Sequence, residues 1–568
     1  MLAMSSGCLF IVASRPWGAV MCKILPTRSA YARPGLRGML RHIVVLALVL
    51  HASAAHAQFD PTKVMREAGL VAQRFPDPAV QFSTPGFRPG REDFTSHAEM
   101  LTFLEGLAGE SRRVKIEILG VSQGGLSLPM VLLTESGEIN SRLPTVLVIG
   151  QQHGNEPAGG EAALVLAQQL ANPRAGLLRR VNVLIIPRGN PDGAQKFKRT
   201  TANGIDVNRD HLLLNTPESR MIALVVHRYR PHLMLDLHEF TVGGRWIEKF
   251  GGVMKYDALV QAATVGNLDS QIAMHAQRYV QRIRVGLGRN GLTSFVYHTT
   301  GAADPEDKVV SMGGVQPDTG RNVGGLRPAI SLLIEARGVG IGRAHFLRRV
   351  HTHVLAANTV IETAAAQRAQ LIRLTREAEQ RARRGACQGD MIVDARLTPA
   401  RERLTFLDVA TGRDLPSEVE WRAASPLSVV RLRARPCGYL IAPNEIPAIE
   451  RLTLLGVQLY KVVKAARWRV ERYVITREGH GQREDARGAI ADDHAVRKVE
   501  VRTERADEVI APGTVYVPLS QPLSPLITAA LEPDSQSSFL ANRVLDFEAS
   551  QLRRVMRMPT AATVCAFP

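Results

Sequence analysis

The feature that most constrains the fold is a series of short apolar runs that alternate with helical stretches between Thr145 and Gly340. The runs are rich in β-branched residues, which is typical of buried strands. They are Thr145–Gly150, Val181–Pro187, Leu233–Leu237 and Ala329–Glu335. Buried strands joined by helices predict an α/β fold with a mixed, largely parallel sheet flanked by helices.

The pattern changes after a long helical stretch at about residues 343–384. Its apolar positions recur every three to four residues, which predicts that one face packs on the preceding domain. Beyond Gly385 the chain alternates several short strand-like runs with two helical pieces, and this favours a smaller α+β or mostly β domain. We therefore expect a first domain over residues 58–385, which includes the long helix, and an accessory domain over residues 386–568.

The first 57 residues are predicted to be a pre-sequence that contains an export signal. Arg41 and His42 precede the apolar stretch Ile43–Leu50, and Ala55–Ala57 has the small-x-small pattern of a cleavage site. The apolar stretch is too short for a membrane-spanning helix, although an N-terminal anchor helix is the alternative. We expect an exported protein, periplasmic or secreted, that starts near Gln58 and has no stable membrane span once the signal is removed.

Five cysteines are too few for a disulfide-dense scaffold. Removal of the pre-sequence leaves Cys387, Cys437 and Cys565, and two of these could pair in an oxidising compartment. We favour Cys387 with Cys437, because both lie inside the C-terminal domain while Cys565 is near the end. The two other pairings stay open at this point.

The chain is basic, with Lys and Arg totalling 71 against 53 Asp and Glu, a net charge of +18. Such an excess is compatible with nucleic acid, a membrane surface or another anionic polymer as a partner. Part of it belongs to the first 57 residues, which contain six basic residues and no acidic one. No zinc-finger, phosphate-loop or RNA-binding signature occurs, so nucleic acid is not an expected partner.

Side chains that can bind a metal or transfer a proton follow three of the predicted strands. His153 and Glu156 follow Thr145–Gly150 in the motif HGNE, while His238 and Glu335 lie at the ends of two later strands. Sites in open α/β sheets form beyond the carboxyl ends of strands, so we expect these residues to converge. Two imidazoles and one carboxylate suit Zn²⁺ and leave a position open for water. Glu335 is the carboxylate available to take the proton of that water.

The segment between these strands supplies further candidates. The turn Asn190–Gly193 is followed by a stretch that holds Arg199, Asp206, Asn208 and Arg209. A hydrolase that selects a terminal carboxylate needs a fixed guanidinium, because Arg binds carboxylate bidentately. It also needs a hydrogen-bond donor near the developing oxyanion. The segment offers candidates for both tasks.

The order of the motifs HGNE, NPDG, R-x4-G-x-D-x-NR, DLH and IEARG resembles that of the zinc carboxypeptidase family of metallopeptidases over about residues 95–345. The chain is identified as an exported bacterial member on this basis. The resemblance implies a mixed eight-stranded sheet between helices and one Zn²⁺ per chain. It implies a metallocarboxypeptidase that removes C-terminal residues from peptides by means of a zinc-activated water and a Glu general base.

The resemblance also assigns roles around the metal. His153, Glu156 and His238 would bind zinc. Glu335 would be the general base and acid. Asp206 would orient His153 and fix its tautomer.

The substrate-binding roles follow from the same resemblance. Asn208 and Arg209 would hold the C-terminal carboxylate of the substrate, and Arg199 would polarise the scissile carbonyl and stabilise the oxyanion. Tyr297 is a candidate for the family's substrate tyrosine only because of its vicinity. The loop Val315–Arg327 is expected to line the pocket for the substrate side chain.

Two other functions are open on the sequence. HGNE is shared with the related aminoacylase and desuccinylase branch, so a zinc amidase or deacylase acting on murein peptides or N-acyl amino acids is the first alternative. An inactive peptide- or polymer-binding protein is the second, and the intact set of candidate residues argues against it. The expected partner is a peptide or cell-wall peptide substrate.

Overall fold

The computed structural model describes residues 59–172, 176–301, 304–481, 496–546, 548 and 551–567. The predicted pre-sequence and its export signal lie outside these residues. In the part of the chain that is described, none of the helices combines the length and the apolar character needed to cross a lipid bilayer.

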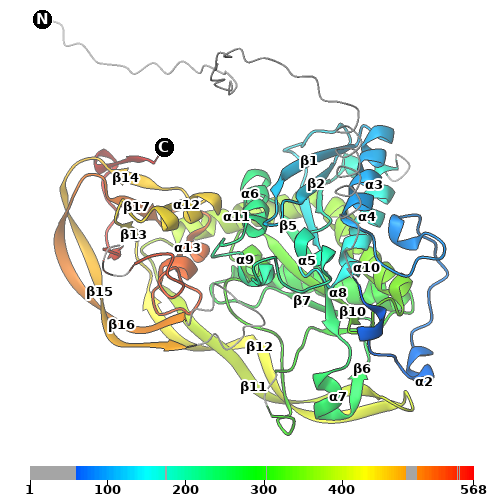
Figure 1. Ribbon diagram of the computed structural model, residues 1–568. Coiled ribbons are helices and arrows are strands. Elements are labelled where there is room, and N and C mark those ends of the chain that lie inside the picture. The colour runs from blue at the N-terminus through cyan, green and yellow to red at the C-terminus, as the bar shows by residue number, and fades with distance from the viewer. Residues whose placement is uncertain are drawn as a thin grey trace, which may run out of the picture. The chain divides into compact units, whose positions relative to one another are not determined.

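Eight strands form a central sheet in the order β1-β2-β4-β3-β5-β10-β7-β8. Figure 1 labels β1, β2, β5, β7 and β10 of this sheet. The pairs β4-β3, β3-β5, β5-β10 and β7-β8 are parallel, whereas β1-β2, β2-β4 and β10-β7 are antiparallel. The predicted mixed, largely parallel sheet is confirmed, and it has the eight strands that the resemblance implies. The strands are β1 (Val114–Val121), β2 (Ser127–Leu133), β3 (Thr145–Gly150), β4 (Asn182–Ile186), β5 (Leu233–Thr241), β7 (Ala258–Ala262), β8 (Ser294–Val296) and β10 (Ile330–Val339).

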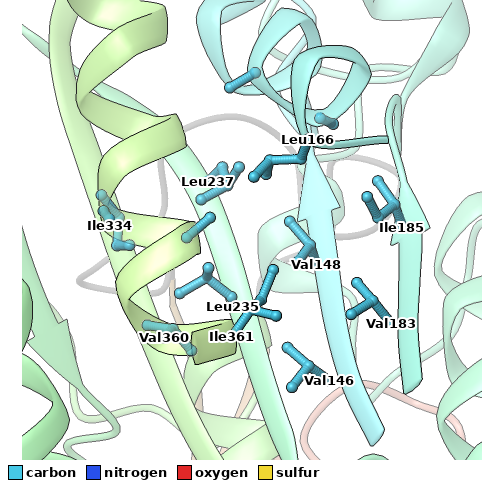
Figure 2. Close-up of a cluster of buried hydrophobic side chains, with 14 of the residues drawn as sticks. Val146, Val148, Leu166, Val183, Ile185, Leu235, Leu237, Ile334, Val360 and Ile361 are labelled. Atoms are coloured by element: carbon cyan, nitrogen blue, oxygen red, sulfur yellow. The ribbon is translucent and has the colours of Figure 1, made fainter. Parts of the chain in front are cut away.

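Helices cover both faces of this sheet. Val146 and Val148 of β3 belong to the apolar cluster that Leu166 of α4 and Val360 of α10 also join (Figure 2). The intervening β3 side chains belong to a second cluster that includes α6. Because successive strand side chains point to opposite faces, a strand covered on both sides must be apolar throughout. The helices on the first face are α3 (His97–Glu110), α4 (Pro157–Ala171), α8 (Ser270–Arg289) and α10 (Phe346–Ala366), and α6 (Pro217–Tyr229) lies on the second.

The long helical stretch is helical as predicted but divided into two helices. α10 ends at Ala366 and α11 (Arg368–Arg384) begins after Gln367, whose ψ of 25° departs from the helical value. The buried residues of α11 are Leu371, Leu374, Thr375 and Ala378. This spacing of three to four residues is the one from which the packed face was predicted.

The C-terminal part of the chain contains an antiparallel sheet of seven strands in the order β16-β15-β18-β13-β17-β14-β19. Residues of α12 (Ile446–Leu454) and α13 (Ser524–Leu531) share an apolar cluster with β13 and β17. The predicted α+β or mostly β character is thus confirmed. The strands are β13 (Gly438–Ile441), β14 (Tyr460–Val462), β15 (Ala466–Gly481), β16 (Val496–Ile510), β17 (Val515–Pro518), β18 (Arg553–Val555) and β19 (Val564–Ala566).

A long hairpin of β11 (Asp390–Asp408) and β12 (Asp414–Ala434) connects the two sheets along the chain (Figure 1). β11 pairs with β6 (Gly252–Met254) and β12 pairs with β9 (Val309–Ser311), so residues beyond 385 share a four-stranded sheet with residues before it. The domain boundary at 385 stays a prediction.

The hairpin is flanked by a disulfide. Cys387 is bonded to Cys437, which confirms the favoured pairing, and Cys565 is an exposed free thiol.

Candidate metal centre

The loop after β3 presents the first two predicted ligands. α4 begins with Pro157 directly after Glu156, because Pro fits the first helical position, where no N–H is required. The loop is held against the turn at Asn190–Gly193: a Cβ on Gly154 would lie 1.9 Å from the carbonyl carbon of Gly193. Only glycine at position 154 permits this backbone approach, which fixes where His153 and Glu156 lie.

The third ligand and the predicted base lie on adjacent strands. β5 carries His238 and β10 carries Glu335, and these two residues are partners in the parallel pairing. Both strands continue past their predicted ends, to Thr241 and Val339. Glu239, in the extension of β5, is buried in an ion pair with Arg349 of α10.

Three donor groups converge at this place. The Nδ1 atoms of His153 and His238 are 3.0 Å apart. The carboxylate of Glu156 lies 2.7 Å from His153 Nδ1 through Oε1 and 2.8 Å from His238 Nδ1 through Oε2. All three residues are buried, and one ligand atom from each lies within 4.8 Å of the others. Among the described residues no other group of His, Cys, Asp or Glu meets this criterion.

The outer nitrogen of each imidazole faces a carboxylate. His153 Nε2 lies 3.0 Å from Asp206 Oδ1, and His238 Nε2 lies 2.9 Å from Asp236 Oδ1. A carboxylate that accepts the Nε2–H proton leaves the Nδ1 lone pair free for a metal. Two such nitrogens and one carboxylate fit the ligand set of zinc. His153, Glu156 and His238 therefore form a zinc site.

Glu335 is a buried carboxyl beside these ligands, with 8% of its surface exposed. Burial raises the pKa of Glu335 to about 7, against the lowering effect of His238, and the charge of Glu156 raises it further. A carboxyl group with a pKa near neutrality can accept a proton and return it under physiological conditions.

Asp206 connects the metal ligands to Arg199. Its Oδ2 accepts a hydrogen bond from Arg199 Nε at 3.0 Å, while its Oδ1 faces His153. Burial opposes ionisation, but the charges of Arg199 and His153 lower the pKa of Asp206 well below its usual value. Arg199 Nη1 lies 3.2 Å from His153 Nδ1 and 3.5 Å from Glu156 Oε1, so this guanidinium reaches the metal site.

Asn208 and Arg209 lie two and three residues after Asp206. Asp206 caps the short helical turn Val207–Arg209 by accepting the backbone N–H of Asn208 at 2.9 Å. The side chain of Asn208 lies beside a metal ligand: its Nδ2 is 3.2 Å from His238 Nε2, and its Oδ1 accepts the N–H of Gly320 at 2.7 Å. Arg209 Nη1 donates to the Asn208 carbonyl at 2.8 Å.

The structure thus places the sequence-predicted residues in one neighbourhood and adds others. Asp236 was missed, although its position two residues before His238 on a strand puts it on the same face. Gln152 was also missed; its Nε2 donates to Asp236 Oδ1 at 2.5 Å. Arg321 lies in the loop expected to line the substrate pocket, but no individual side chain of that loop was selected.

Comparison with known sequences agrees with this chemistry. Residues 100–221 match the family model described as zinc carboxypeptidase. The chain is 30% identical over 445 residues to the protein named "Probable carboxypeptidase 2" of Trichophyton verrucosum, covering 74% of this chain and 85% of the relative. It is 28% identical over 541 residues to carboxypeptidase 2 of Trichophyton rubrum, covering 91% and 98%.

Solved structures give weaker matches. A metallo-carboxypeptidase of Burkholderia cenocepacia aligns at 17% identity with a TM-score of 0.36, over 47% of this chain and 69% of that one. A metallo-carboxypeptidase of Pseudomonas aeruginosa aligns at 21% identity with a TM-score of 0.36, over 47% and 69%.

Proposed function

The chain belongs to the zinc carboxypeptidase family, and we propose that it releases the C-terminal residue of peptides with Glu335 as the proton-transfer group and Arg199, Asn208 and Arg209 as the substrate-binding groups. The observation that carries this proposal is the convergence of a His-Glu-His zinc site with a buried carboxyl on the strand next to His238. A zinc ion held by these residues would supply Lewis acidity, which acidifies water and polarises a carbonyl.

Glu335 has the environment of a proton carrier. Its carboxylate accepts the proton of the attacking water, and the resulting carboxylic acid donates that proton to the nitrogen of the leaving residue. A pKa of about 7 suits both directions, because neither protonation state is strongly favoured near neutral pH.

Arg199 is proposed to donate to the oxygen of the scissile carbonyl. Two nitrogens of this guanidinium lie within 3.0 Å of Asp206 Oδ2, which holds its orientation. Its Nη1 faces the ligand atoms of His153 and Glu156, on the side where the carbonyl must lie. A fixed donor of this kind stabilises the negative charge that develops on the oxygen.

Asn208 and Arg209 are proposed to bind the terminal carboxylate. A carboxylate held here would restrict cleavage to the last peptide bond, because an internal residue has no such group. Asp206 supports this pair as well, through the backbone of Asn208. One buried carboxylate is thereby proposed to align a metal ligand, the carbonyl-binding Arg199 and the carboxylate-binding segment.

We also propose that the protein is exported and that residues 386–568 form an accessory domain. The Cys387–Cys437 disulfide supports export, since such bonds persist in oxidising compartments.

The test is a digestion of peptide and murein-fragment libraries by the zinc-loaded protein with and without a chelator, followed by mass spectrometry. The proposal expects chelator-sensitive loss of single C-terminal residues. Cleavage of internal bonds or of acyl groups, with the C-terminal residues retained, would instead favour an amidase or deacylase.

A further inference from the structure

Arg321 is a buried arginine for which no carboxylate lies within ion-pair distance in the described part of the chain. It lies on α9 (Gly320–Gly325) and is 5% exposed. Its Nη2 donates to the Gly314 carbonyl at 2.8 Å and to Thr264 Oγ1 at 3.2 Å, while its buried Nε has no hydrogen-bond partner. Burial of a charge is costly unless it is paired, so a guanidinium kept in this state is poised for an anionic ligand.

α9 is attached to the segment proposed to bind the terminal carboxylate. The Gly320 N–H, one residue before Arg321, donates to Asn208 Oδ1 at 2.7 Å, and the His211 N–H donates to the Asp318 carbonyl at 3.2 Å. Burial lowers the pKa of Arg321, the nearby charge of Arg209 lowers it too, and Glu335 raises it. The two hydrogen bonds therefore hold the start of α9, and Arg321 with it, against the segment that contains Asn208 and Arg209.

The orientation of this guanidinium is constrained by its surroundings. Its Cζ lies 5.6 Å from the centroid of the Tyr297 ring. A Cβ on Gly313 would come within 2.7 Å of Tyr297 and 3.0 Å of Arg321 Nη2, so a larger residue would not fit there. The packing fixes the direction of Arg321 before any substrate arrives, which reduces the entropy lost on binding.

We propose that Arg321 binds the side-chain carboxylate of a C-terminal Asp or Glu, so that the enzyme releases acidic residues in preference to neutral or basic ones. The inference rests on the proposed function, since it requires the terminal carboxylate at Asn208 and Arg209. A C-terminal acidic residue carries two carboxylates a few atoms apart, and the site offers two separate arginines. A neutral side chain would leave Arg321 buried and unpaired, and a basic one would add repulsion.

The test uses N-acylated dipeptides that differ only in the last residue, which is Glu, Gln, Leu or Lys. A hydrogen bond to a charged group contributes about 1.5–3 kcal/mol, so we expect kcat/KM for Glu to exceed that for Gln by about 10- to 100-fold. Arg321→Met should remove this ratio by lowering kcat/KM for Glu, whereas kcat/KM for Gln and Leu should not fall, because a neutral side chain no longer leaves a buried guanidinium unpaired. Arg321→Lys should restore part of it, because the charge returns without the bidentate geometry.

A binding measurement and a matched control separate specificity from loss of structure. Intact dipeptides are titrated calorimetrically into the Glu335→Gln variant, where we expect the Glu peptide to bind more tightly than the Gln peptide only when Arg321 is present. Arg327→Met removes another arginine of the same loop, whose Nη2 donates to the Leu455 carbonyl, and should leave the Glu-to-Gln ratio intact.

Other outcomes would contradict either the inference about Arg321 or the proposed function. A wild-type preference for Leu or Lys refutes the acidic preference, and an equal loss on all substrates in Arg321→Met refutes the role of Arg321; in both cases the carboxypeptidase activity stands. If the wild-type enzyme releases no C-terminal residue from any peptide, the proposed function fails, and the inference fails with it.

Discussion

Glu335 lies opposite His238 in the parallel pairing of β10 with β5. β10 is hydrogen-bonded on its other side to β7, where Glu335 pairs with Leu259, so the carboxyl is carried by a strand inside the sheet. The position of the proposed base relative to a zinc ligand is thus set by backbone pairing. Sites on such strands hold their geometry more precisely than sites on loops.

Asp206→Asn should weaken zinc binding by about 10- to 100-fold, the usual effect of losing a carboxylate that orients a ligand histidine. It should also lower kcat/KM, because Arg199 loses its partner. Competition with a chromogenic chelator measures the affinity. Asp210→Asn is the matched control: Asp210 is equally buried but binds Asn215, Thr216 and Ser219, so zinc affinity should survive there. Equal affinities in the two variants would contradict the assigned role of Asp206.

Gly154→Ala should abolish zinc binding or folding, because its Cβ would overlap the backbone of Gly193. Gly109→Ala in α3 is the control, since nothing lies within 4 Å of its added Cβ. That change should stabilise the protein by about 0.5–1 kcal/mol, the difference in helix propensity between Gly and Ala. Zinc content and thermal midpoints distinguish the two. A Gly154→Ala protein with normal zinc content would show that the close approach is dispensable.

Glu67 should make stability depend on pH in the acid range. Burial raises its pKa, but hydrogen bonds from His345 and Arg337 lower the pKa of Glu67 to about 2 in the folded protein. Because this value is below the usual 4.5, the stabilisation is complete above about pH 4.5 and is lost as the pH falls towards 2.

The variant Glu67→Gln isolates this contribution. At pH 7 it should lose on the order of 1–3 kcal/mol, and the difference from wild type should shrink as the pH is lowered from 4.5 to 2. Urea midpoints of the two metal-free proteins at pH 7 and pH 3 measure it. A difference that is the same at both pH values would argue against the ion pairs of Glu67.

The Cys387–Cys437 bond should stabilise the protein without contributing to turnover. Replacing both cysteines by Ser should lower the stability by about 2–4 kcal/mol, because the unfolded chain gains freedom. Dipeptide hydrolysis at room temperature should be unchanged, and Cys565→Ser, which alters an exposed free thiol, should change neither property. Thermal midpoints with and without a reductant provide the readout, and reductant-insensitive unfolding would contradict the pairing.

The metal site could be predicted because each of its residues lies at or near the end of a strand that the local sequence pattern identifies. His153 and Glu156 follow an apolar strand, and His238 and Glu335 lie on two other apolar strands that the alternation with helices brings into one sheet. Their convergence follows from the fold class alone. The strand ends could not be predicted, because Glu239 is accommodated inside the structure by an ion pair with Arg349, a partner that is distant in sequence and that no local pattern identifies.

Other features depend on contacts between distant segments. Asp236 and Arg321 acquire their roles from neighbours that no local pattern reveals, namely the ring of His238 and the segment around Asn208. The pairing of β11 with β6 and of β12 with β9 could not be predicted either, since the sequence pattern of a strand does not indicate which strand it pairs with. The sequence therefore predicts elements and ligand types better than it predicts which segments meet.

The most direct test of the central claim compares wild-type protein with Glu335→Gln, measuring zinc per chain and release of C-terminal residues on the same samples. We expect one zinc per chain in both proteins and a rate lower by about 10²- to 10⁴-fold in the variant, the usual contribution of a general acid-base group. Wild-type protein without stoichiometric zinc, or a variant with unchanged turnover, would contradict it.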